Sequence, residues 1–151
     1  MIDKTKSEWA NLIHFTKGQN NEVYGDRTPG IWLHVSNTKR LLVAFPQNGN
    51  KNFVCNSVEL SEGSWNKIEF SQYEEGGIFY QKLLLNGNRI GDCQSVMSNS
   101  SPRKFENLKV YQGDPWYTPA ANAKLRNVMV WSSAEKMKYG NLKCDDGTGK
   151  C

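Results

Sequence analysis

Short runs in which hydrophobic and polar residues alternate cover most of this chain. Residues 9–16 (WANLIHFT) alternate with a period of two, which is typical of a half-buried β-strand. This period predicts that Asn11 and Ile13 share one face of the strand and that Leu12 and His14 share the other. Further strand signals, separated by glycine, proline and asparagine, cover residues 30–35, 40–46, 52–55, 57–60, 65–72, 77–91, 105–112 and 123–131.

The segment at residues 77–91 predicts a β-hairpin, because Asn86-Gly87 is the strongest two-residue turn signal between strands. With this hairpin the chain has about ten short strands and no convincing helix before residue 133. Such a series predicts an all-β fold, an antiparallel sandwich or barrel. Residues 133–151 are expected to form a C-terminal tail with helix-like composition, for which Ser133 is a candidate N-cap.

The order of several motifs resembles that of a known superfamily. Trp65 opens a strand (WNKIEF), and the next strand ends in LLLNG. Residues 9–18 look like the first strand of that superfamily, and residues 24–34 and 41–50 look like its second and third. The segment NVMVW near the end looks like its closing strand. In these features residues 8–132 resemble laminin-G-like and other concanavalin A-like lectin/glucanase domains. The pieces YGDR, NGN and DPWYTPA are similar to a subgroup found in extracellular invertebrate proteins of uncertain function.

The resemblance implies a two-sheet antiparallel jelly-roll sandwich over residues 1–132, used to bind carbohydrate or protein and often carrying one calcium ion on its rim. It also implies that residues 9–16 pair with residues 123–131. That pairing would bring residues 17–29 and 113–121 to the same rim. Strand 30–35 runs away from this rim and strand 40–46 returns, so the segment PQNGNK is expected there too.

The rim loops hold carboxylates, amides and aromatic rings, the mixture that recognises sugar hydroxyls and the apolar face of a pyranose. We therefore expect a ligand site at Asp26, Asn48, Asn50, Asp114, Trp116 and Tyr117. The same two carboxylates, with loop carbonyls, are candidate calcium ligands, although no cofactor is required.

Each of these residues also has a structural interpretation. Asp26 beside Arg27 could bind the backbone amides of its own loop, as short acids in turns commonly do. Trp116 could close the end of the sandwich, and Asn48 and Asn50 could serve only as turn residues. The sequence leaves these alternatives open.

The four cysteines are Cys55, Cys93, Cys144 and Cys151, and their spacing fits no zinc site. Four cysteines allow three disulfide pairings. We favour Cys144 with Cys151, because CDDGTGKC is a short polar loop that could close on itself, which leaves Cys55 with Cys93. This pairing predicts an oxidising compartment, and four free thiols in a cytosolic protein are the alternative.

Charge and motifs argue against several classes of protein. The formal net charge of +4 is spread along the 151 residues, without the dense basic tract of a nucleic-acid-binding protein. No run approaches the roughly 18 apolar residues of a membrane-spanning helix, and the first residues lack the apolar segment of a secretory signal. No glycosidase carboxylate pattern or serine nucleophile motif occurs, and the acidic cluster at Glu69, Glu74 and Glu75 is expected to be a solvated hairpin end.

The sequence thus predicts a non-catalytic, extracellular or secreted binding module. Carbohydrate binding through the rim loops is one hypothesis. The other is an adhesion or receptor fragment that binds an extracellular protein or forms a homodimer through a sheet face or strand edge. Neither hypothesis involves nucleic acid or membrane insertion.

Overall fold

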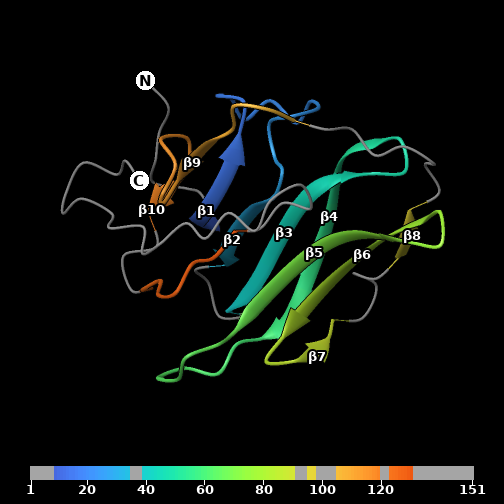
Figure 1. Ribbon diagram of the computed structural model, residues 1–151. Helices are drawn as coiled ribbons and strands as arrows, with labels where there is room; N and C mark the ends of the chain where they lie inside the picture. The colour runs from blue at the N-terminus through green and yellow to red at the C-terminus, as the bar shows by residue number, and fades with distance from the viewer. Residues whose placement is uncertain (1–8, 35–38, 91–94, 98–104, 120–122, 131–151) are drawn as a thin grey trace.

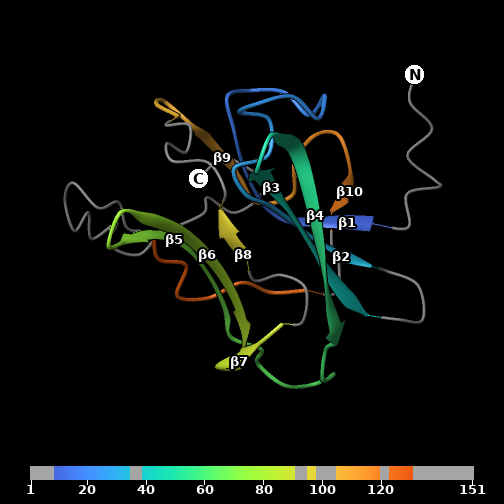
Figure 2. The same ribbon diagram turned by 90° about the vertical axis from the view of Figure 1, so that its right-hand side faces the viewer.

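Two β-sheets stack face to face in the computed structural model, which describes residues 9–34, 39–90, 95–97, 105–119 and 123–130 (Figure 1). These residues contain no helix, and therefore none long and apolar enough to cross a membrane. Figure 2 shows the two layers from the side, with β5 and β6 facing β1 to β4. The all-β prediction is confirmed for the described part of the chain.

The larger sheet has six strands in the order β10-β1-β2-β3-β4, with β9 also paired to β1. All pairs are antiparallel except β1 with β10, which is parallel. The strands are β1 (Trp9–Thr16), β2 (Gly30–His34), β3 (Arg40–Gln47), β4 (Asn50–Glu59), β9 (Lys109–Tyr111) and β10 (Thr118–Pro119).

The smaller sheet has four strands, in which β6 pairs with β5, β7 and β8. All of these pairs are antiparallel, and the predicted hairpin at Asn86-Gly87 is confirmed between β6 and β7. The strands are β5 (Ile68–Glu75), β6 (Ile78–Leu85), β7 (Asn88–Arg89) and β8 (Ser95–Met97).

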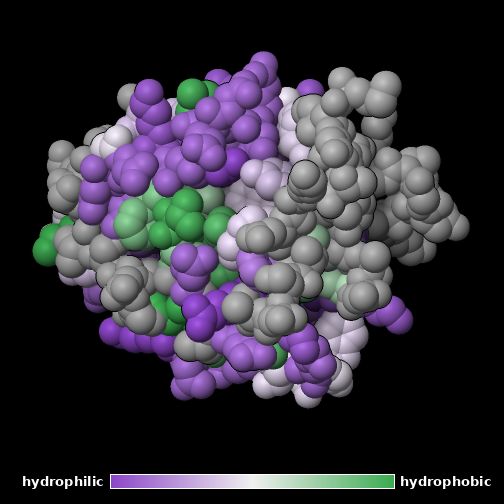
Figure 3. Space-filling model, turned by 180° about the vertical axis from the view of Figure 1, so that it is seen from behind, coloured by the Kyte–Doolittle hydropathy of each residue, from purple (hydrophilic) through white to green (hydrophobic). Residues whose placement is uncertain are grey.

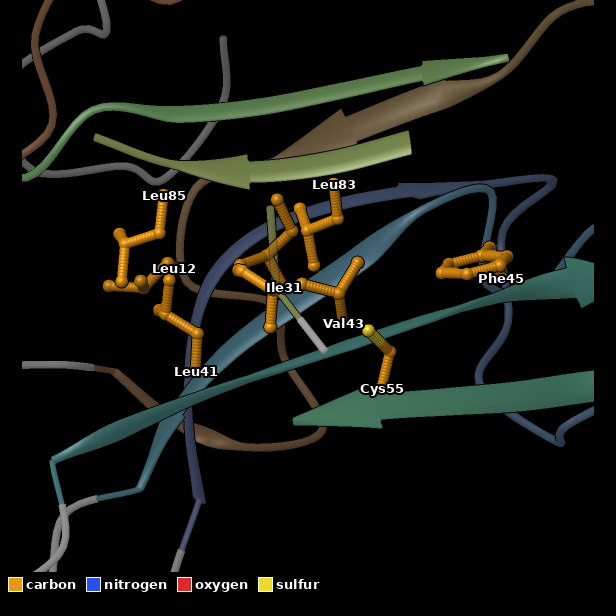
Figure 4. Close-up of a cluster of buried hydrophobic side chains, with 9 residues drawn as sticks. Leu12, Ile31, Leu41, Val43, Phe45, Cys55, Leu83 and Leu85 are labelled. Carbon is orange, nitrogen blue, oxygen red and sulfur yellow. The ribbon is translucent and has the colours of Figure 1, made fainter. Parts of the chain in front are cut away.

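The main hydrophobic core lies between the two sheets. Leu83 and Leu85 of β6 point from the smaller sheet toward side chains of β1, β2 and β3, as Figure 4 shows. A fully buried leucine, isoleucine or valine contributes roughly 1.5–3 kcal/mol, so this layer supplies much of the stability. Its buried members are Leu12, Ile31, Leu41, Val43, Phe45, Cys55, Leu83, Leu85 and Ile90.

A β-bulge in β1 changes which residues face this core. Across the β1–β2 pair, Asn11 lies opposite Trp32 but the next aligned residue, Ile13, lies opposite Ile31, so Leu12 is the extra residue. Both Leu12 and Ile13 pack in the core, whereas His14 shares with Asn11 the outer face of the sheet. The prediction that Leu12 and His14 share a face is therefore wrong.

Most predicted strands are confirmed, with two changes of boundary. The two signals at residues 52–55 and 57–60 form one strand, β4, and β5 begins at Ile68, so Trp65 lies in the preceding loop. The buried Cys55 is disulfide-bonded, and Cys93, Cys144 and Cys151 lie outside the described residues. The predicted pairings thus stay predictions, as does the tail at residues 133–151.

The closing strand expected at residues 123–131 is not found in the part of that segment that the structure describes. Residues 123–130 belong to no strand, and Asn127 has a φ of 51°, which interrupts extended backbone. Instead Ala123 and Leu125 pack against the core, and the neighbours of β1 are β2, β9 and β10. The strand pairing that served as the premise is therefore wrong, but residues 113–119 still lie beside β1, because β9 precedes them and β10 lies within them.

Candidate functional site

Three segments that are distant in sequence meet at one end of the larger sheet and over its outer face. They are residues 17–29, the turn at residues 48–49 with the start of β4, and residues 113–117, and we call them the rim loops. Tyr24 Oη donates to the carbonyl of Gly49 at 3.1 Å, and Arg27 contacts both the start of β4 and Tyr117. The predicted convergence of these loops is thus confirmed.

His14 is the buried junction between β1 and two of the rim loops. Its Nδ1 lies 2.7 Å from Asp114 Oδ2, and its Nε2 is hydrogen-bonded to the backbone carbonyl of Asp26. Because a carbonyl only accepts, Nε2 must carry a proton. The imidazole is 0% exposed and both of its nitrogens are engaged, so it acts as a crosslink between the loops.

Asp114 organises the short turn that follows it. Its Oδ1 accepts hydrogen bonds from the backbone amides of Trp116 and Tyr117, both at 3.0 Å. Its own amide donates to Asn11 Oδ1 at 3.1 Å, and Asn11 Nδ2 donates to the carbonyl of Ile31 at 3.3 Å. An aspartate that bonds amides two and three residues ahead fixes a turn, which here sets the position of both aromatic residues.

Asp26 secures the corner at the start of β2. Its Oδ2 accepts the backbone amide of Asn21 at 2.6 Å, and its amide donates to the carbonyl of Val23 at 3.1 Å. The side chain is buried. These contacts match the structural interpretation of Asp26, and we regard both Asp26 and Asp114 as anchors that position the loops.

Arg27 joins all three rim loops through one buried guanidinium group. Its carbon Cζ lies 5.0 Å from the centre of the Trp32 ring, a cation–π contact on the outer face of β2. The residue is only 6% exposed, and Glu22 is the one carboxylate that pairs with it among the described residues. The acceptors are Asn20 Oδ1 at 2.7 Å, Asn52 Oδ1 at 2.9 Å, Glu22 Oε1 at 3.1 Å and Tyr117 Oη at 3.2 Å.

Aromatic rings fill the space between these polar groups. Trp32 meets His14 at 5.3 Å and Tyr117 at 5.5 Å, and Trp116 meets His14 at 5.7 Å, all in edge-to-face arrangements that aromatic pairs favour. The Trp32 ring lies over Gly30, where an added Cβ would come within 2.0 Å of Trp32 Cη2. We call His14, Arg27, Trp32, Asp114, Trp116 and Tyr117 the outer cluster.

The structure divides the predicted site residues into two groups. Asp26, Asp114, Trp116 and Tyr117 are brought together around His14, and the two aromatic residues remain partly exposed. Asn48 and Asn50 lie on the exposed β3–β4 turn, where Asn48 has a φ of 49° and Asn50 Oδ1 accepts the amide of Asn52. The turn interpretation of these asparagines is thus supported, and their amide groups are at the surface.

Sequence reasoning misses His14, Asn11 and Asn52 as parts of this arrangement. The available signal was a set of polar residues inside an otherwise apolar strand, since Asn11, His14 and Thr16 all lie in β1 and all are buried. Buried polar side chains are nearly always hydrogen-bonded, so such residues point to partners elsewhere in the chain.

Both predicted calcium ligands, Asp26 and Asp114, are hydrogen-bonded to groups of the protein. Asp26 Oδ2 accepts a backbone amide hydrogen, Asp114 Oδ1 accepts two, and Asp114 Oδ2 is hydrogen-bonded to the His14 imidazole. Among the residues that the structure describes, no group of three or more histidine, cysteine, aspartate or glutamate side chains is placed to hold a metal ion. Calcium binding stays a prediction to be tested by titration.

Comparisons with protein-family models, with curated proteins and with solved structures found no match for this chain.

Proposed function

We propose that this chain is a non-catalytic extracellular binding module, a jelly-roll β-sandwich that binds carbohydrate through the rim loops. The observation that carries the proposal is the position of Arg27. One guanidinium group bonds residues from all three rim loops, so the loops are held as a single surface. Loops that are ordered before binding lose less conformational entropy when a ligand arrives.

The chemistry of this surface suits a neutral, hydroxyl-rich ligand. Asn50 and Asn48 lie exposed on the β3–β4 turn, and amides both donate and accept hydrogen bonds, as sugar hydroxyls do. Trp116 and Tyr117 are partly exposed and supply apolar surface, and Tyr117 is linked to the start of β4 through Arg27. Figure 3 shows hydrophilic side chains gathered over the upper end of the outer face, the end where residues 17–29 lie in Figure 1.

We propose no catalytic role because the titratable groups of the outer cluster are already hydrogen-bonded within the protein. Both nitrogens of His14 are bonded to the protein, and Asp114 bonds two backbone amides as well as this imidazole. A general acid or base must reach a proton of the substrate, and these groups are fully enclosed.

A glycan array followed by isothermal titration tests the proposal. We expect the wild-type domain to bind a neutral glycan and the Asn50→Ala variant to bind it about tenfold more weakly, because a ligand hydrogen bond is lost. Ser71→Ala, on the smaller sheet, is the matched control and should bind as the wild type does. Silence on the array, or equal binding by the Asn50→Ala variant, would contradict the proposal.

Calcium is tested in the same titration. The comparison is wild-type protein against Asp26→Asn, with and without added calcium ion, and thermal unfolding reports whether the variant is folded. A heat of calcium binding that disappears in the variant would assign Asp26 as a ligand. Glycan binding that is unchanged by chelation would show that the rim loops act without a metal.

A specific observation favours the second candidate function, binding to a protein or to another copy of the chain. On the outer face of the smaller sheet Tyr73 and Tyr80 stack at 5.3 Å, and Tyr73 and Ile78 are 44% and 46% exposed. Aromatic residues are enriched at interfaces. Sedimentation at increasing concentration tests the binding of another copy. Self-association that Tyr73→Ser abolishes would support it, and a monomer at every concentration would contradict it.

A further inference from the structure

Trp65 lies at the end of the sandwich opposite the rim loops. β4 starts beside the rim loops and runs away from them, so the loop at residues 60–67 follows at the far end, the lower end in Figure 1. There Trp65 is 52% exposed. Single exposed apolar residues are common on protein surfaces. The contacts that hold Trp65 in place are less common.

The loop that carries Trp65 is fixed by asparagine side chains. Asn66 Nδ2 donates to the backbone carbonyls of Ser61 and Ser64, at 3.0 and 3.3 Å. Asn86, from the β6–β7 turn, donates through Nδ2 to Asn66 Oδ1 at 3.1 Å. Trp65 is therefore presented to solvent on a loop that two elements hold in place.

Arg126 lies against the exposed indole. Its carbon Cζ is 3.9 Å from the centre of the Trp65 ring, close enough for direct stacking of the guanidinium plane. The segment that carries Arg126 is anchored by Ala123 and Leu125, which pack on the hydrophobic core. Two separate segments of the chain thus converge on one exposed aromatic and cationic pair.

The guanidinium group has no acidic partner among the residues that the structure describes. Two acidic residues of the adjoining loop and strand are paired with lysines, Glu62 with Lys39 and Glu69 with Lys67 at 3.0 Å. Arg126 makes no ion pair or hydrogen bond within the described part of the chain. Its planar set of N–H donors, a shape that matches a carboxylate or sulfate group, faces solvent.

We propose that Trp65 and Arg126 form a binding site for an acidic sugar unit, separate from the rim loops. The carboxylate or sulfate group of the sugar accepts hydrogen bonds from the guanidinium, and the apolar C–H face of the pyranose covers the exposed indole. Charge-assisted hydrogen bonds are roughly twice as strong as neutral ones, and stacking restricts the arginine before binding. The net charge of +4 adds a weak attraction for acidic glycans, which salt reduces.

The experiment is a titration of the whole chain with an oligogalacturonate and with heparin, followed by the indole N–H resonance of Trp65. We expect that resonance to move with at least one of the two probes and not with a neutral oligoglucose. Isothermal titration calorimetry measures the affinities of the variants, and Arg126→Gln and Trp65→Ala should each bind about tenfold more weakly, the loss of one charge-assisted contact or one stacking contact. The probe that binds more tightly distinguishes a sulfate ligand from a carboxylate ligand.

Matched controls separate this site from general charge and from the rim loops. Lys124→Gln removes the same charge from an exposed residue on the same segment and should change the affinity less than twofold, since a single screened surface charge contributes little. Arg126→Lys keeps the charge but loses the planar fork, so it should also weaken binding. Asn50→Ala, at the rim loops, should have no effect on this titration.

Equal losses in the Arg126→Gln and Lys124→Gln variants would overturn the proposal, because binding would then follow net charge alone. No shift of the Trp65 resonance with either acidic probe would overturn it as well. Circular dichroism and thermal unfolding of each variant should match the wild type, because both side chains are exposed. Failure of this titration leaves neutral-glycan binding at the rim loops intact, so the two proposals fail separately.

Discussion

The two faces of the larger sheet are packed by different kinds of interaction. The inner face buries aliphatic side chains against Leu83 and Leu85 of the smaller sheet. The outer face buries His14, Arg27 and Asp114 in a network of directional hydrogen bonds and edge-to-face rings. The inner layer holds the sheets together, whereas the outer cluster holds three loops in place on one sheet.

Burial on the two faces of this sheet therefore has two different structural effects. Apolar packing is non-directional and tolerates exchange between residues of similar volume. A buried charge is stable only with its partners, so each group of the outer cluster specifies where another must lie. The outer cluster therefore fixes loop geometry, and the inner core fixes the fold.

The largest effect is expected from His14→Leu, which leaves the buried Asp114 carboxylate without its imidazole partner. Breaking a buried pair by removing one member typically lowers the free energy of unfolding by about 3–5 kcal/mol. Urea unfolding measures this change. The double variant His14→Leu with Asp114→Asn should recover part of the loss, and no recovery would mean that the pair is not coupled.

Leu83→Ala tests the inner core. Leu83 is 0% exposed, and truncation of a buried leucine to alanine lowers the free energy of unfolding by about 2–5 kcal/mol. Because Leu83 packs in the core between the two sheets, glycan affinity of the folded variant should equal that of the wild type. Urea unfolding and titration calorimetry, performed on the same sample, measure both quantities.

A smaller effect is expected from Gly30→Ala, whose new methyl group would meet the Trp32 ring. Overpacking of this kind lowers stability by about 1–3 kcal/mol. If the clash is with the indole, combining Gly30→Ala with Trp32→Leu should give a loss well below the sum of the two single losses. Additive losses in this double-mutant cycle would show that the methyl group is accommodated elsewhere.

The smallest effect is expected from Tyr24→Phe, which removes the hydrogen bond to the Gly49 carbonyl between two rim loops. A hydrogen bond of this kind contributes about 0.5–1.5 kcal/mol, and partial exposure favours the lower value. Thermal unfolding should show a small decrease in Tm. A decrease as large as that of Leu83→Ala would mean that the contact between these loops supports the whole fold.

The inner core was largely predictable from the sequence, and the outer cluster only in part. Apolar residues recur along the segments of β3 and β6, as expected of strands that a sheet buries, and the turn at Asn86-Gly87 marks the hairpin. Local patterns of this kind depend only on neighbouring residues. The position of the rim loops was predicted as well, although from a strand pairing that does not occur.

The features that the sequence could not reveal are the register of β1 against β2 and the contacts of β1 with residues distant in sequence. The single extra residue at Leu12 reverses the faces of β1, so His14 points away from the core into which alternation would place it. The partner of its Nδ1, Asp114, lies 100 positions away along the chain. The polar residues within β1 indicate that partners exist, but the local pattern identifies neither the bulge nor Asp114 as the partner.

Amide hydrogen exchange of Arg27→Gln against the wild type tests most directly whether the outer cluster fixes the rim loops. We expect amides in residues 17–29, 48–52 and 113–117 to exchange faster in the variant, while those of β3 and β6 keep their protection, because the guanidinium contacts only the loops and the outer face. Unchanged protection in all three rim loops, or an equal loss throughout both sheets, would contradict this interpretation.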